Sequence, residues 1–127
     1  MAKPTHEDAM IMLQVAQWGA ATHLTEALNW MWSDEFVTDG EGFWAKYPFG
    51  SQGAQKIITI VNHFETLGTL WKQGLFNEAL LFDWLAVSAV WARAKNCFLE
   101  IRKVAGNPAL FENFEALANA QSARDAG

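Results

Sequence analysis

The sequence predicts an all-α protein, a compact helical bundle of about four main helices with short extra helical turns between the first and the second. Apolar residues recur every three or four positions along most of the chain, as they do on the buried face of a helix. The sequence contains no runs of alternating apolar and polar residues, which would indicate strands. It also contains no repeats or low-complexity tracts, so helix-on-helix packing accounts for the whole chain.

Length and composition predict one folded domain spanning residues 1–127. A chain of this length buries about two thirds of its unfolded surface around a single core. Apolar residues make up 51% of the chain and charged residues 18%, a balance that favours a folded protein over a disordered one.

The net charge of -5 opposes binding to phosphate backbones, and the sequence has no stripe of lysine and arginine. We therefore expect neither nucleic acid nor an acidic membrane as a partner. The amino terminus lacks the apolar core of a signal peptide, and no apolar run reaches the length of a membrane span. A single cysteine, Cys97, excludes an internal disulfide and fits a reducing compartment, so we expect a cytoplasmic protein.

The first helix is predicted over residues 5–32. Thr5 stands three residues before Asp8, the spacing of a capping box, and apolar residues follow at helical spacing. Gly19 lies inside this helix and costs about 1 kcal/mol relative to alanine. A kink or a close helix crossing at Gly19 would explain why it is tolerated there.

The connection after this helix is rich in aromatic residues. We expect a turn at Phe36, a loop, and a helical turn over residues 43–47 that ends at Pro48. The stretch from Asn29 to Gly50 contains seven aromatic rings: Trp30, Trp32, Phe36, Phe43, Trp44, Tyr47 and Phe49. These rings either close the core as a lid, form an exposed partner surface, or line a pocket for an apolar ligand. The predicted partner surface consists of Trp30, Trp32, Phe43, Trp44 and Tyr47.

Three more helices are predicted beyond the connection. The second begins near Ser51 and ends at Gly74, and the third runs from its cap at Asn77 to Gly106. Because the third helix is apolar almost all round, we expect it in the centre of the bundle. Pro108 is expected to open the last helix, and the chain is expected to fray from about residue 120.

Polar residues on the second and third helices suggest a buried cluster of Asn62, Glu65, Arg93 and Arg102. A carboxylate facing the bundle interior needs a partner, and arginine offers bidentate donors. We therefore expect Glu65 to pair with Arg93 or Arg102. Such a pair either fixes the register of the helices or contributes to a ligand site.

Signatures of catalysis or cofactor binding are missing from the sequence. The pair His23 and Glu26 lacks the further ligands of a di-iron bundle, and Cys97 has no Cys/His partner pattern. The stretch Gly50–Gly53 precedes a helix without the spacing of a phosphate-binding loop. We predict no catalytic residue, no metal and no cofactor.

Two stretches carry a family resemblance. NHFETLGTLWKQGLFNEALLFDWLAVSAVWARAKNCFLEIRK, followed by GNPALFENFEALA, resembles a family of bacterial helical proteins known only as a domain of unknown function. HEDAMIMLQVAQWGAATHLTEALNWMW is similar to it too. The features that carry the resemblance are Phe64, Glu65, Gly68, Lys72, Gly74, Leu75, Asp83, Trp84, Trp91, Arg102, Asn113, Phe114, Glu115 and Leu117. The resemblance implies a small helical domain with no assigned activity, cofactor or catalytic residue.

The sequence leaves two functions open. One is a homodimeric protein-interaction or regulatory module, held in two-fold symmetry through aromatic residues of the first helix and the connection. The other is a small-ligand-binding or enzymatic domain that uses Asn62, Glu65 and Arg102. A cavity of about 300 Å³ or more beside these side chains would favour the second function.

Overall fold

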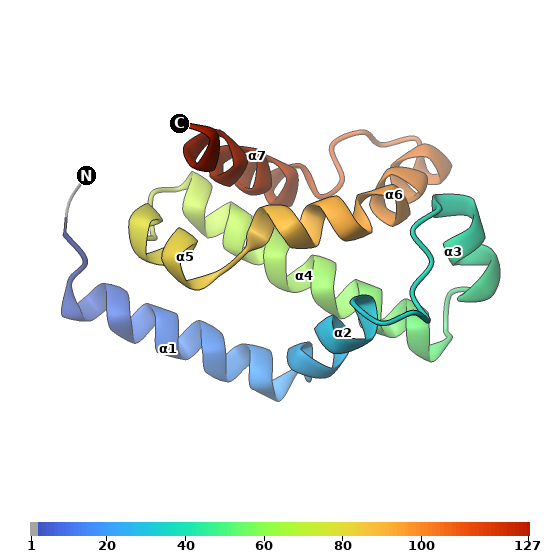
Figure 1. Ribbon diagram of the computed structural model, residues 1–127, viewed down its shortest axis with the longest axis horizontal. Coiled ribbons are helices and arrows are strands. Elements are labelled where there is room, and N and C mark those ends of the chain that lie inside the picture. Colours follow the sequence, from blue (N-terminus) through green and yellow to red (C-terminus); the bar gives the residue numbers. More distant parts are fainter. Residues whose placement is uncertain (1–2) are drawn as a thin grey trace.

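The computed structural model describes residues 3–127, and this range contains helices and no strand (Figure 1). The helices are α1 (His6–Ala21), α2 (Leu24–Met31), α3 (Gly40–Lys46), α4 (Gln52–Lys72), α5 (Glu78–Trp84), α6 (Val87–Ala105) and α7 (Glu112–Ala126). The all-α prediction is confirmed. The number of helices is larger than expected because two of the predicted long helices are broken.

The predicted first helix is two helices, α1 and α2, separated by Thr22 and His23. The capping box at Thr5 is confirmed, since the Asp8 N–H donates to Thr5 Oγ1 over 3.1 Å and the Thr5 N–H donates to the Asp8 carboxylate over 2.8 Å. The break occurs where His23 adopts the left-handed conformation, with φ 61° and ψ 37°. Gly19 lies inside α1 without a break, and a Cβ atom there would lie 3.3 Å from the Leu24 side chain and 3.4 Å from the His63 ring, so the packing around it is tight but has no clash.

The predicted third helix is also broken, at Leu85 and Ala86, between α5 and α6. Gln121 of α7 satisfies the backbone groups that the break exposes. Its side-chain N–H donates to the Leu85 carbonyl over 2.7 Å, and its Oε1 accepts from the Ser88 N–H over 2.8 Å. Gln121 is 4% exposed, and α7 continues to Ala126. The chain therefore remains helical beyond residue 120, where we expected it to fray.

The last helix was predicted to begin at Pro108, but α7 begins at Glu112. Residues 107–111 form turns, in which the Asn107 side chain accepts from the Ala109 N–H over 3.0 Å. Phe111 then adopts a left-handed conformation with φ 63°. Its ring packs edge-on against Phe98 with centroids 5.6 Å apart. Packing against α6 therefore determines how the chain enters α7.

The central helix is α4, and the prediction that the third helix would be central is wrong. α4 crosses the middle of the molecule and packs against α2 on one side and α7 on the other (Figure 1). Its buried residues are Gly53, Ala54, Ile57, Ile60, Val61, His63, Phe64, Leu67 and Gly68. A helix buried over so wide an arc has neighbours on several sides.

The start of α7 is held by a carboxylate from α4. Glu65 Oε1 accepts from the Phe114 N–H, and Glu65 Oε2 accepts from Asn113 Nδ2, each over 2.9 Å. The N-cap residue of α7, Phe111, has no side-chain cap of its own. Glu65 therefore satisfies a first-turn N–H that a local cap usually binds. Gly68 lies one turn further along α4, where a Cβ atom would clash with the Asn113 carbonyl.

α1 packs against α4 through an aromatic stack. The rings of Trp18 and His63 lie 4.5 Å apart and 23° from parallel. His63 is 3% exposed, and its Nδ1 has no hydrogen-bond partner among the described residues. Burial lowers the pKa of His63 from 6.5 to about 4, because the charged imidazolium loses its hydration. His63 is therefore neutral at pH 7.

Replacing Glu65 by alanine should destabilise the protein by about 1–3 kcal/mol, because the buried Phe114 N–H loses its acceptor. The measurement is the free energy of unfolding in denaturant. Glu112→Ala is the matched control, since it removes an exposed acid from the same turn of α7. Equal losses in the two variants would show that only the negative charge near the helix start matters.

Stability should fall as the pH is lowered from about 6.5 towards 4, because the unfolded state binds a proton at His63 that the folded state excludes. The full effect is about 3 kcal/mol. Denaturant unfolding at several pH values measures it in the wild type and in His63→Leu, which should lose this part of the pH dependence. A His23→Gln control should retain it, because His23 is exposed. Parallel curves for the wild type and His63→Leu would contradict the prediction.

Candidate functional site

The aromatic connection closes the core, in agreement with the first of the three interpretations. Trp30 and Phe36 are each 7% exposed, and Phe43 is fully buried. Their rings pack together, with Trp30 edge-on to Phe36 at 5.3 Å and Phe36 against Phe43 at 5.4 Å. Trp30 and Phe43 are therefore core residues, and placing them on a partner surface was wrong.

The other three residues of the predicted partner surface keep part of their rings at the surface. Trp32 is 53% exposed, and the Arg93 guanidinium lies 5.6 Å from its ring. Tyr47 is half-buried and donates its hydroxyl to the Glu35 carbonyl over 2.8 Å. Trp44 is half-buried and donates its indole N–H to the Cys97 carbonyl over 3.0 Å.

The predicted polar cluster does not form. Glu65 binds the start of α7, as described above, and pairs with neither arginine. Arg93 donates to the Met31 carbonyl over 2.9 Å. Arg102 donates to the Leu110 carbonyl over 2.7 Å and pairs with Glu115 at 2.9 Å. Each arginine thus holds a chain connection next to α6.

Asn62, the fourth predicted member of the cluster, is exposed. The two oxygens of Glu65 are already bound by groups of α7. The predicted site of Asn62, Glu65 and Arg102 is therefore not assembled, which removes the basis for a ligand site at these residues.

The chain offers little chemistry for a metal or a nucleophile. No group of three or more histidine, cysteine or acidic side chains that could hold a metal ion occurs within residues 3–127. Cys97 is buried, and burial raises the pKa of its thiol to about 12, with a further rise from the charge of Asp39. A thiol with this pKa is protonated and unreactive at neutral pH.

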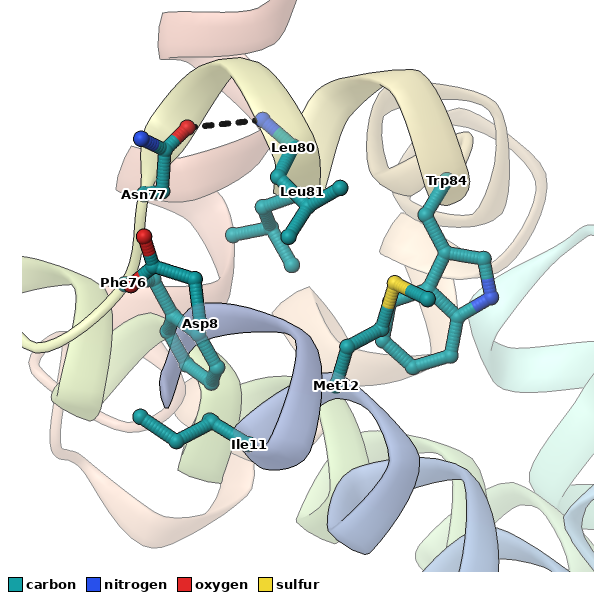
Figure 2. A pocket seen from close by; sticks show the side chains of 8 residues that line it. All are labelled: Asp8, Ile11, Met12, Phe76, Asn77, Leu80, Leu81 and Trp84. Carbon is teal, nitrogen blue, oxygen red and sulfur yellow. Dashed lines mark hydrogen bonds between the residues drawn. The ribbon is translucent and has the colours of Figure 1, made fainter. Parts of the chain in front are cut away.

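One hollow lies between α1 and α5, and Figure 2 shows its lining. Ile11 and Met12 of α1 face Leu81 and Trp84 of α5, with Asp8 and Asn77 at one end. The hollow has a volume of about 10 Å³. That is room for about one water molecule, so this hollow is a packing gap between two helices and not a ligand site.

A larger groove lies between α3 and the last turns of α6, with a volume of about 340 Å³. Trp44 and Phe49 form one wall, with stacked rings 4.8 Å apart. The other residues that line the groove are Glu41, Glu100, Ile101, Val104 and Ala105. Phe49 is 72% exposed and Val104 79% exposed. An exposed apolar hollow of this kind is typical of a binding surface.

Sequence reasoning identified one wall of this groove and missed the other. Trp44 was part of the predicted partner surface, because aromatic residues gather in the connection. Val104 lies in the polar last turns of α6 and gives no signal by itself. Only the packing of α3 against α6 brings the two walls together.

The outward face of α1 is a second exposed apolar surface. Met10 is 60% exposed and Leu13 is 59% exposed. Val15 and Gly19, on the opposite side of the same helix, are buried. Within residues 3–127, no helix combines the length and the hydropathy that crossing a bilayer requires.

Cys97 should not react with Ellman's reagent in the folded protein near pH 8, because its thiol is buried and protonated. The measurement is the absorbance of the released thiolate, before and after unfolding in guanidinium chloride. The unfolded chain should release one equivalent, which serves as the internal control. Rapid reaction of the folded protein would contradict the burial of this side chain.

Comparison with known proteins supplies a family and no relative of known function. A search of curated proteins found no match, and a search of solved structures found none either. One family model, described as a domain of unknown function (DUF4760), matches residues 4–121. The resemblance to a helical family of unknown function is thereby confirmed, and the chain belongs to the DUF4760 family.

Proposed function

We propose that this protein is a homodimeric interaction module that associates through the outward face of α1. The observation that carries the proposal is the exposure of Met10 and Leu13, at 60% and 59%. Large apolar side chains on one helix face are typical of helix pairing between subunits. α1 replaces the aromatic connection as the main self-association surface, because Trp30 and Phe43 are buried.

The charge distribution favours a second copy as the occupant of this face. The protein carries a net charge of -5, so two copies repel each other over most of their surfaces. From residue 9 of α1 to its C-cap, Thr22, the chain contains no lysine, arginine, aspartate or glutamate. Beyond its first turn, which contains Glu7 and Asp8, α1 therefore brings no charged side chain to such a pairing.

Two-fold symmetry makes such a face complementary to itself. In an antiparallel pair of α1 helices, each residue that contacts its partner is contacted in the same way in return. Met10, Leu13 and Gln17 recur at helical spacing and share one side of α1. This stripe would form the centre of the interface, with Gln14 beside it as a hydrogen-bonding group.

The proposed compartment of this dimer is the cytoplasm. The single cysteine of the chain is buried and protonated, which fits a protein that neither forms nor needs disulfides.

The oligomeric state can be measured by size-exclusion chromatography with light scattering at high micromolar concentration. The wild type should have the mass of a dimer, and Leu13→Glu should be monomeric because it places two carboxylates at the symmetric contact. Leu75→Glu is the matched control, since Leu75 is 56% exposed on the loop after α4. A monomeric wild type, or a Leu13→Glu variant that remains dimeric, would disprove the proposal.

A further inference from the structure

We propose that the groove between α3 and α6, together with a polar hollow beside it, binds a basic amphipathic segment of a partner protein. The groove would take an apolar side chain of that segment, and the hollow would take a lysine or arginine. This surface differs from the outward face of α1, because α3 and the end of α6 lie at the far end of the molecule from the start of α1 (Figure 1).

The apolar wall of the groove is held in place from behind. The Trp44 indole N–H donates to the Cys97 carbonyl of α6 over 3.0 Å, and the Trp44 ring packs edge-on against the buried ring of Phe43 at 5.0 Å. Phe49 stacks on the outer side of Trp44. Binding therefore orders few side chains in this wall, which reduces the entropic cost of association.

A polar hollow adjoins the groove, and charged side chains make up much of its lining. It has a volume of about 330 Å³, and Glu41 and Glu100 line both hollows. Asp39 adds a third carboxylate. Lys103 is the one cation among the residues that line the two hollows.

Lys103 leaves this acidic character largely intact. Its Nζ lies 3.8 Å from the Glu41 carboxylate, and both side chains are at least 70% exposed. An ion pair of this kind is weak in water. Glu100 has no ion pair among the described residues, so its carboxylate is available to a basic side chain from outside.

Charge decides between the possible occupants. A second copy of this chain would bring the same net charge of -5 to an acidic surface, and nucleic acid or an acidic membrane would be repelled in the same way. A segment that combines an apolar anchor with a basic residue satisfies both hollows at once. Such complementarity increases the association rate and selects among partners.

The experiment measures fluorescence anisotropy of labelled synthetic peptides with the full chain. The probe is an amphipathic peptide of leucine and lysine, about four helical turns long, and the control peptide has glutamate in place of lysine. The leucine–lysine peptide should bind at least about tenfold more tightly than the control peptide. Equal binding of the two peptides would overturn the proposal.

Variants of the protein separate this groove from general attraction to an acidic surface. Val104→Ser removes part of the apolar wall and Glu100→Gln removes one charge, and each should weaken binding of the leucine–lysine peptide about fivefold. The matched controls, Leu75→Ser and Glu112→Gln, make similar changes at exposed positions outside both hollows and should leave binding unchanged. Equal effects in the two sets would overturn the proposal.

Two further outcomes would assign the groove to another occupant and overturn the proposal. One is a change in oligomeric state caused by Val104→Ser, which would place a second copy in the groove. The other is sedimentation with phosphatidylcholine vesicles that Val104→Ser abolishes, which would place a membrane surface there. The Leu13→Glu variant should bind the leucine–lysine peptide like the wild type, so the outcome does not depend on whether α1 forms a dimer.

Discussion

The contact between α4 and the start of α7 is the interaction on which the rest of the structure depends. Gly68 allows the backbone of Asn113 to lie directly on α4, and Glu65 accepts from the Phe114 N–H and from the Asn113 side-chain amide at the start of α7. Phe114 is thereby placed in the core, stacked on Phe64 at 5.2 Å. α7 in turn holds the break between α5 and α6 through Gln121. The Glu65 carboxylate and the lack of a side chain at Gly68 thus position α7 on α4, and through α7 they also position α5 and α6.

The aromatic connection has a complementary role, because it closes the end of the bundle that α7 does not cover. Burying Trp30, Phe36 and Phe43 leaves the indole of Trp44 and the ring of Phe49 at the edge of this lid. These rings are next to the last turns of α6, where carboxylates collect. The two exposed apolar surfaces described above therefore differ in their surroundings: α1 carries no charged residue from residue 9 onward, whereas the α3–α6 groove borders an acidic hollow.

Sequence patterns predicted the fold class and most helix ends, because caps and glycine stops are local signals. Thr5, Ser51 and Asn77 cap helices as expected, and Gly74 and Gly106 follow helix ends with positive φ. The breaks at His23 and Leu85 were missed, because neither residue type breaks helices and tertiary packing decides there. The predicted pairing of Glu65 with an arginine was wrong because its donors, the Phe114 N–H and the Asn113 side-chain amide, lie at the start of α7. Residue spacing within α4 and α6 does not reveal a contact with α7. Of the groove, the sequence predicted Trp44 but not Val104, because only the packing of α3 against α6 brings these two residues into one lining.

The entry into α7 carries a locally frustrated residue. Glycine is the residue that adopts the backbone conformation of Phe111 without strain, yet glycine has no ring to place against Phe98. The strained backbone of Phe111 is tolerated because the packing of its ring against Phe98 compensates for the strain. Such conflicts between local conformation and packing limit which sequences share a fold. A family member that relieves the conflict with glycine needs another large side chain to occupy the space beside Phe98. Position 111 should therefore vary within the family together with the position that supplies this second side chain.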